Sequence, residues 1–427
     1  MRVASENGKQ PARLDPRSRS CPALAPPGAL LLAWSFMPPP VPSAEEELHW
    51  LALRLIPGLG ARTSGKLLHR FRTPQAIFRA SRTELEGAGV SGSVAQSIVS
   101  GCAFEDAAAQ REKMVQVGAL LITLGDERYP RALREIFDPP VLLFARGRVE
   151  LIDSICLGVV GTRRPTPYGL AVAERLSADL AHAGLTIVSG MARGIDSAAH
   201  KGALAAGGNT VAVLGCGVDV VYPSENRKLA AELAAKGLII SEFPMGAVAF
   251  PQNFPIRNRI ISGASVGVLV VEGAQYSGSA ITAKLALDQG REVFAVPGNI
   301  TSKLSWGPNL LIKQGARLVQ DWNDVVAELP AESRRHLIEE GRKRIEAEAG
   351  GTPEGGQTSL LHDQGPELDA IARRALQALQ VDASIHLDDL LEKVEDISPS
   401  EMIAALFELE MLGLVKQLPG KNFVKVW

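Results

Sequence analysis

The sequence predicts an α/β fold with a doubly wound, mostly parallel sheet in residues 116–330. Six apolar segments alternate there with helix-like segments, at 155–160, 185–188, 210–214, 238–241, 266–271 and 292–296. This alternation is typical of βαβ units. The runs at 157–160 and 268–271 contain no alternating polar residues, so we expect them to be buried between two helix layers. Together these observations predict an extended Rossmann-like domain.

Residues 44–115 are predicted to form a helical module. Two glycine hairpins, Gly58-Leu59-Gly60 and Gly87-Ala88-Gly89, each lie between helix-like segments. One interpretation is a tandem helix-hairpin-helix module, whose turns present backbone N–H groups to a DNA phosphate. The other is a sterile-alpha-type (SAM-like) bundle in which glycine only permits tight turns. The short apolar runs at 119–123 and 141–145 are expected to add edge strands or to pack against the central domain.

The C-terminal part is predicted to be a winged-helix domain at 367–427. Three helix-like segments, at 367–380, 386–394 and 399–412, precede a hairpin at 414–417 and 422–425. Residues 331–366 contain a Gly- and Pro-rich run at 350–359 and are interpreted as a linker. Residues 1–43 are expected to be a disordered extension. A signal peptide around Ala29–Trp34, or translation that begins at Met37, is the alternative there.

Composition and charge limit the class of protein. The 427 residues are 46% apolar and 22% charged, with a net charge of −2. Residues 151–320 hold 15 Lys/Arg against 11 Asp/Glu, a net of +4, whereas residues 321–427 hold 11 against 21, a net of −10. A polyanion should therefore meet the central domain. The four cysteines lack metal-site spacing, and no apolar run reaches the roughly 20 residues that a membrane span needs, so we expect a cytoplasmic protein without a metal.

Glycine-rich loops with arginine follow several of the predicted strands. Such loops share the carboxyl edge of a parallel sheet, where helix starts offer unpaired N–H groups. Each arginine alone is as consistent with a salt bridge as with a ligand, and Phe254 is either a stacking surface or a core residue. We expect phosphates to be held at this edge by residues Gly161, Thr162, Arg163, Arg164, Ser189, Gly190, Arg193, Arg257, Arg259, Ser277, Gly278 and Ser279.

Nucleotide-binding and catalytic motifs are missing from the sequence. Neither GxGxxG nor GxxxxGK[ST] occurs, which argues against dinucleotide and P-loop sites. A catalytic interpretation would use Asp196, His200, Glu242 or Glu272, but helix capping and packing account for Asp196 and His200 without chemistry. We therefore expect a protein that is not an enzyme and that needs no cofactor.

Several ordered motifs resemble the DprA (Smf) family of DNA-processing proteins: VGTRRPTPYG, VSGMARGIDSAAHKGAL, SEFPMG with FPIRNRIISG, and EGAQYSGSAITAKLALDQGREVFAVPGNI. The resemblance implies binding of single-stranded DNA without sequence preference, protection of incoming DNA, loading of RecA during natural transformation and recombination, and a homodimer. It also implies a DNA pocket formed by Gly161, Thr162, Arg163, Ser189, Gly190, Arg193, Phe254, Arg257, Asn258 and Arg259.

Three further observations bear on this interpretation. Ile256 stands where an additional arginine is common in that family, so the basic cluster is thinner here. A nucleoside-monophosphate phosphoribohydrolase is the alternative function, although Pro297-Gly298-Asn299-Ile300-Thr301 does not supply the PGGxGT loop of that class. The acidic C-terminal region also suggests a protein-interaction scaffold.

Overall fold

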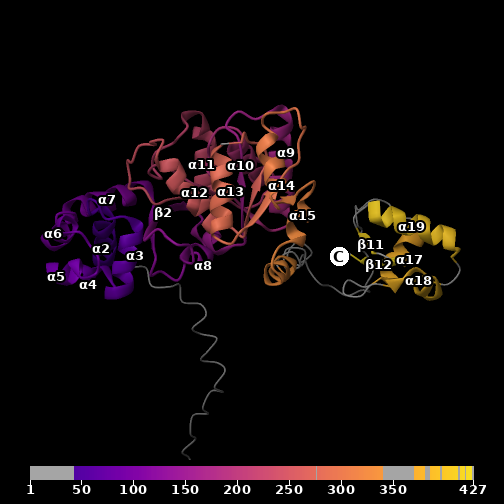
Figure 1. The fold of residues 1–427 in the computed structure, drawn as a ribbon, viewed down its shortest axis with the longest axis horizontal. Coiled ribbons are helices and arrows are strands. Elements are labelled where there is room, and N and C mark those ends of the chain that lie inside the picture. Colours follow the sequence, from indigo (N-terminus) through magenta and orange to yellow (C-terminus); the bar gives the residue numbers. More distant parts are fainter. Residues whose placement is uncertain are drawn as a thin grey trace, which may run out of the picture. The chain divides into compact units, whose positions relative to one another are not determined.

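The computed structural model describes residues 43–275, 277–339, 370–379, 385–394, 397–411, 414–418 and 420–425 (Figure 1). The chain divides into two compact units between residues 349 and 350. The predicted extension at 1–43 lies outside the described residues except for Ser43, and so does the predicted linker from residue 340 onward. None of the described helices combines the length and apolar character that crossing a bilayer requires.

The described residues of the larger unit form one nine-stranded sheet in the order β1-β2-β6-β5-β4-β3-β7-β8-β9. Strands β3 to β9 are parallel. At one edge β2 runs opposite to them, and β1 pairs antiparallel with β2, so β1 runs in the same direction as β3 to β9. This confirms the predicted doubly wound sheet. The strands are β1 (Leu120–Thr123), β2 (Leu142–Gly147), β3 (Cys156–Val160), β4 (Thr186–Ser189), β5 (Thr210–Val213), β6 (Leu238–Ser241), β7 (Gly267–Val270), β8 (Glu292–Ala295) and β9 (Arg317–Leu318).

Helices cover both faces of this sheet (Figure 1). Alternate residues of β3 divide between two apolar cores. Leu157 and Val159 pack with α9 (Pro167–His182), α10 (Ile195–Ala205) and α15 (Trp322–Ala327). Cys156 and Val160 pack with α8 (Arg131–Arg134), α12 (Asn253–Gly263) and α13 (Gly278–Asp288). Helix α11 (Arg227–Lys236) packs against β6 and β2, and α14 (Trp306–Lys313) packs against β8. Burial on both faces explains why the strand sequences do not alternate.

The N-terminal helices dock against the β1–β2 edge. They are α2 (Ala44–Leu55), α3 (Ala61–Phe71), α4 (Pro74–Arg79), α5 (Arg82–Glu86), α6 (Gly92–Ser100) and α7 (Phe104–Val117). Leu51 and Phe144 belong to one continuous apolar core. The side chain of Gln110 accepts a 2.7 Å hydrogen bond from the Met245 N–H, and Arg54 Nε donates to the Glu242 carbonyl at 3.2 Å. The helical module is therefore fixed to the sheet.

The smaller unit contains three helices and a three-stranded sheet among its described residues. Helices α17 (Ala370–Ala378), α18 (Leu387–Lys393) and α19 (Pro399–Met411) share an apolar core with β10 (Ile385–His386), β11 (Val415–Leu418) and β12 (Asn422–Lys425). The strand order is β10-β12-β11, with both pairings antiparallel. The predicted helices and hairpin are present. The two-residue strand β10 was not predicted, because so short a segment has no periodic pattern.

Candidate nucleic-acid interface

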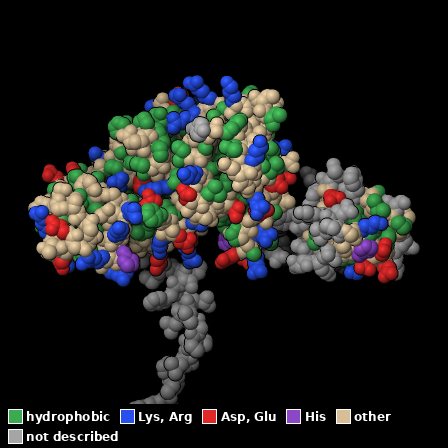
Figure 2. Space-filling model, in the orientation of Figure 1, with side chains coloured by type: hydrophobic (Ala, Val, Ile, Leu, Met, Phe, Trp, Pro, Cys, Tyr) green, Lys and Arg blue, Asp and Glu red, His purple; other side chains and the backbone are tan. Residues whose placement is uncertain are grey.

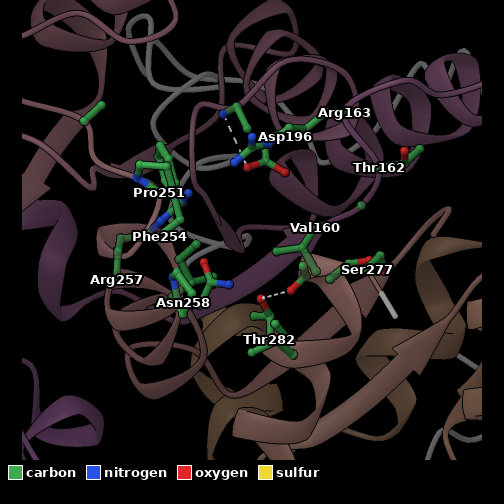
Figure 3. Close-up of a pocket in the computed structure, with 18 of the residues that line it drawn as sticks. Val160, Thr162, Arg163, Asp196, Pro251, Phe254, Arg257, Asn258, Ser277 and Thr282 are labelled. Atoms are coloured by element: carbon green, nitrogen blue, oxygen red, sulfur yellow. Dashed lines mark hydrogen bonds between the residues drawn. The ribbon is translucent and has the colours of Figure 1, made fainter. Parts of the chain in front are cut away.

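A cavity of about 530 Å³ opens at the carboxyl ends of the parallel strands. Strands β3 and β7 are neighbours in the sheet, yet the chain leaves β3 toward β4 on one side and leaves β7 toward β8 on the other. Such a switch point leaves a crevice between the two loops, which is where ligands bind in open α/β sheets. The loop after β3 and the first turns of α12 and α13 line this cavity (Figure 3).

The loop after β3 is held rigidly and projects Arg163 outward. A Cβ atom on Gly161 would lie 2.5 Å from Ile195 Cγ1 and 2.9 Å from the Glu272 carbonyl oxygen, so only glycine fits. The Thr162 N–H donates to the Glu272 carbonyl at 2.7 Å, and its own carbonyl accepts from the Ile195 N–H at 3.2 Å. Arg163 is exposed and lines the cavity.

Two guanidinium groups lie near the ring of Phe254. The Cζ atoms of Arg163 and Arg257 are 4.9 Å and 5.9 Å from the centroid of its ring, and the Tyr222 ring is 5.6 Å away at an interplanar angle of 33°. The helix that carries Phe254 is anchored at its start, where Asn253 Nδ2 donates to the Gly215 carbonyl at 2.9 Å. An aromatic ring beside cations offers both a stacking face for a base and charge for its phosphate.

Arg257 is a buried cation whose hydrogen bonding is incomplete. Its side chain is 4% exposed, and its Nε and Nη1 atoms have no partner among the described residues. Burial lowers the pKa of Arg257, and the charge of Asp196 opposes this effect. Burial also raises the pKa of Asp196, against the opposing charge of Arg257. Buried donors without partners are costly, and neither of these two atoms is exposed to a ligand, so Arg257 contributes its charge to the cavity rather than these donors.

Asp196 orders the loop on which Arg257 packs. Its carboxylate accepts hydrogen bonds from the N–H groups of Gly190 and Ala192, at 3.2 Å and 3.4 Å. The guanidinium of Arg257 lies directly on Gly190, where a Cβ atom would be 1.4 Å from Nη1. Close packing against Arg257 therefore requires glycine at position 190. This contact accounts for the glycine without a contact to a ligand.

The opposite wall of the cavity carries hydroxyl groups without charge. Ser277 caps α13 by accepting from the Ala280 N–H at 3.4 Å, and the hydroxyls of Ser277 and Ser279 are 2.7 Å apart. A Cβ atom on Gly278 would meet nothing within 4 Å. Thr282 and Asn258 also line the cavity. This wall offers hydrogen bonds at a helix N-terminus, which suits an anion.

Two of the predicted pocket residues lie elsewhere. Ser189 is fully buried, and its hydroxyl donates to the Val159 carbonyl at 2.6 Å. Arg259 is 6% exposed and forms ion pairs with Glu242 at 2.5 Å and Asp138 at 3.3 Å. Both side chains bond within the fold and do not line the cavity, so the structure corrects their predicted place in the pocket.

Two other predicted arginines are exposed but are not among the residues that line the main cavity. Arg193 forms an ion pair with Glu225. It lines a smaller cavity of about 50 Å³ that shares Arg163 and Phe254 with the main one. Arg164 is exposed, and its backbone N–H donates to the Thr162 hydroxyl at 3.2 Å.

The four residues considered for catalysis have structural partners. His200 is buried, its Nδ1 lies 2.7 Å from the Thr210 hydroxyl, and burial lowers its pKa to about 3. Glu272 accepts from the N–H and hydroxyl of Thr166, at 2.9 Å and 2.6 Å. Glu242 pairs with Arg259, as described above. Of the four, only Asp196 lines the cavity. No cluster of metal-ligating side chains occurs within the described part of the chain.

Sequence reasoning missed several cavity residues, and three of them are of interest. Tyr222, Pro251 and Thr282 line the cavity beside the predicted set. Tyr222 is exposed and precedes a cis peptide bond to Pro223. An aromatic residue before proline, in a loop after a strand, is the signal that would have pointed to Tyr222. Thr282 lies one helical turn after Gly278, so extending the serine-rich helix start by one turn would have included it.

The fold and cavity define a Rossmann-like domain suited to anions, within a chain that also carries a winged-helix unit. The family model described as DNA recombination-mediator protein A matches residues 120–330, and the DprA winged helix domain matches residues 362–421. The Synechocystis protein Smf is 34% identical over 88% of this chain and 98% of its own length. The chain belongs to the DprA (Smf) family of DNA-processing proteins.

Two further relatives agree with this assignment. The Bacillus subtilis DNA processing protein DprA is 44% identical over 52% of this chain and 74% of its own length. The crystal structure of DNA processing protein A from Streptococcus pneumoniae superposes with a TM-score of 0.58 at 34% identity. That superposition covers 67% of this chain and 99% of the pneumococcal chain. The similarity therefore includes the sheet and its helices.

Proposed function

We propose that this chain binds single-stranded DNA without sequence preference in the cytoplasm, protects it, and loads RecA onto it during natural transformation and recombination. In this proposal it acts as a homodimer, and it uses neither a cofactor nor a catalytic step. Membership of the DprA (Smf) family supports the DNA-processing role. The resemblance to that family supports the RecA and homodimer parts.

The observation that carries the proposal is the ring of Phe254 beside Arg163 and Arg257 in the cavity. Arg257 lines this cavity and supplies positive charge for a phosphate, and the start of α13 adds backbone N–H donors. A ring that faces a cavity can stack on an unpaired base, and this contact is tolerant of sequence because every base has a π face. In a duplex the bases are already stacked on one another, so single strands fit this arrangement better.

The surface charge near the cavity agrees with a polyanionic ligand. Figure 2 shows Lys and Arg side chains gathered along the upper edge of the larger unit, above α10 and α11. The domain that contains this edge has a net charge of +4 over residues 151–320. Such a local excess raises the association rate and the salt sensitivity of binding to a polyanion.

Adjacent arginines provide a matched test of the proposed site. Arg163→Ala removes a cation that lines the cavity, whereas Arg164→Ala removes a neighbouring exposed cation that does not. We expect Arg163→Ala to lower the salt slope of oligo-dT binding by about 0.7, and Arg164→Ala to leave it nearly unchanged. Fluorescence titrations across a salt series measure both slopes. Equal slopes for wild type and Arg163→Ala would contradict binding of the DNA backbone in this cavity.

The RecA and homodimer parts have separate tests. RecA filament formation on strands coated with single-strand-binding protein should be faster when this protein is added. An unchanged rate of filament formation would contradict the RecA-loading role but not the binding of DNA. Light scattering after gel filtration gives the mass in solution, and a mass near the 45.4 kDa of one chain would contradict a homodimer.

A further inference from the structure

A second cavity, of about 520 Å³, lies between helix α3 and the segments on either side of α8. Arg62, Lys66 and Arg72 come from the helix side of this groove, and Arg134 and Phe137 come from the other side. No Asp or Glu occurs among the residues that line it. Residues 44–150 are nearly neutral as a whole, with 14 Lys/Arg against 13 Asp/Glu. The excess of positive charge in the groove therefore comes from where the fold places these side chains.

The basic residues of α3 form one stripe. Arg62, Lys66 and His69 are spaced four and three residues apart, which places them on one face of the helix, and all three are exposed. Arg72 follows at the C-cap with φ +71°, a conformation that favours glycine, and so carries backbone strain beside the groove. Arg62, Lys66 and Arg72 form no ion pair with any described residue.

The start of α3 is arranged for an anion rather than for helix stability. Its first turn contains Arg62 and no acidic residue, and its N-cap, Gly60, supplies no side-chain hydrogen bond. A cation near a helix N-terminus is unfavourable, because the N–H groups there already carry partial positive charge. Helices α2, α5 and α7 of the same module follow the usual rule, with Glu45, Glu46 and Glu47 in the first turn of α2. An anion bound at α3 would offset this local excess of positive charge.

Aromatic side chains accompany the charge. Phe137 is 75% exposed, and Arg62 Cζ lies 4.4 Å from its ring centroid. Trp50 lines the same groove and is half-buried. An exposed phenylalanine beside a guanidinium is the combination of stacking face and charge that sequence-tolerant single-strand binders use. Phe254 with Arg163 has the same character in the first cavity.

We propose that the α3 groove, formed by Trp50, Arg62, Lys66, Arg72, Arg134 and Phe137, binds a second stretch of single-stranded DNA outside the central cavity. This inference rests on the proposed function and extends the path of the strand onto the N-terminal helices. The cations hold phosphates, and the Phe137 ring stacks on an unpaired base. A cavity of this volume admits individual nucleotides, so the occupant is a single strand.

The two glycine hairpins of the helical module differ in their position relative to the α3 groove. Gly60 is the N-cap of α3, whose residues line the groove, although neither Gly58 nor Gly60 lines it. In the second hairpin, the Gly87 carbonyl accepts a 2.9 Å hydrogen bond from Arg70, and neither Gly87 nor Gly89 lines the groove. The second hairpin therefore contacts α3 through Arg70 and lies outside the groove.

A charge-matched pair of double variants in the full chain tests this groove. Arg62→Gln/Lys66→Gln removes two groove cations from α3, and Arg79→Gln/Lys113→Gln removes one exposed Arg from α4 and one exposed Lys from α7, outside the groove. The probes are oligo-dT of about 6 and about 30 nucleotides, below and above the reach of one site. Two lost phosphate contacts should lower the salt slope for the long probe by about 1.4, which is roughly 25-fold in affinity at ~0.1 M salt. The short probe should be unaffected, because it fills the central cavity.

The outcomes are distinguishable from failure of the proposed function. Two results would contradict DNA binding in the α3 groove. One is equal affinity of the two double variants for the long probe, and the other is an equal loss of affinity for both probes. Unchanged binding of both probes by Arg163→Ala would instead overturn the central site. Binding of poly-glutamate that depends on Arg62 and Lys66, without an effect on oligo-dT, would assign the groove to an acidic protein partner and overturn the proposal.

A second variant guards against a folding defect. Phe137→Leu keeps an apolar side chain at the exposed position and removes only the stacking ring, so the fold should be preserved. Loss of one base stack should weaken the long probe by roughly 5- to 150-fold and leave the short probe unchanged. Thermal midpoints equal to that of the wild type confirm that both groove variants are folded. Wild-type affinity of Phe137→Leu for the long probe would contradict the stacking role.

Discussion

Replacing Gly190 with alanine should drive Arg257 out of its buried position. The new Cβ atom would lie 1.4 Å from Arg257 Nη1 and 2.3 Å from its Cζ, so the two groups cannot occupy these places together. The backbone itself accepts alanine, because Gly190 is not among the glycines with positive φ. The clash is therefore the whole effect of the substitution.

The expected loss of stability comes from two sources. Overpacking of a buried site costs about 1–3 kcal/mol. Displacement of the guanidinium also leaves Asp196 buried without the opposing charge of Arg257, and an uncompensated buried charge costs up to about 3–5 kcal/mol. Asp196 keeps its hydrogen bonds from the N–H groups of Gly190 and Ala192, so we expect a total of about 2–5 kcal/mol. Oligo-dT binding should fall as well, because Arg257 lines the cavity.

A double-mutant cycle measured by urea unfolding of the larger unit isolates the clash. In the Arg257→Ala background the added methyl group meets no guanidinium, so Gly190→Ala should cost less than about 0.5 kcal/mol there. Gly278→Ala is the control, since a Cβ atom at that position meets nothing within 4 Å. If Gly190→Ala lowers the free energy of unfolding equally with and without Arg257, the packing argument is refuted.

Three further predictions concern the same domain. Phe254→Leu should weaken oligo-dT binding by about 1–3 kcal/mol in fluorescence titrations through loss of base stacking, and unchanged affinity would contradict that role. Glu225→Gln should release Arg193 from its ion pair and raise the salt slope of binding by about 0.7, whereas an unchanged slope would show that Arg193 does not reach the strand. His200 has a folded-state pKa of about 3 against an ordinary 6.5, so the unfolded chain binds its proton first as the pH falls. The stability present above pH 6.5 should therefore decline from 6.5 toward 3 by up to about 1.4 kcal/mol per pH unit, and His200→Gln should flatten this part of the urea-unfolding profile. The same slope in His200→Gln would contradict this assignment.

Much of the fold was predictable because its signals are local. The six apolar segments of the central domain correspond to β3 through β8, since each is long enough for its hydrophobic pattern to be read. The loops that follow β3 and β7 also meet at one cavity, as the geometry of parallel strands requires. The two-residue strands β9 and β10 escaped prediction because they exist only through pairing with β8 and β12.

The sequence by itself determined the sheet, its carboxyl edge and the presence of arginine, glycine and Phe254 there. Only the tertiary structure decided which arginine faces the cavity. Arg257 and Arg259 are two positions apart on α12, so the helix directs them to opposite sides, Arg257 toward the cavity and Arg259 toward Glu242 and Asp138. The phase of the helix is set by burial of its apolar face against the sheet, and the acidic partners come from distant segments. The α3 groove is likewise a product of tertiary contact, because its two sides are far apart in the chain.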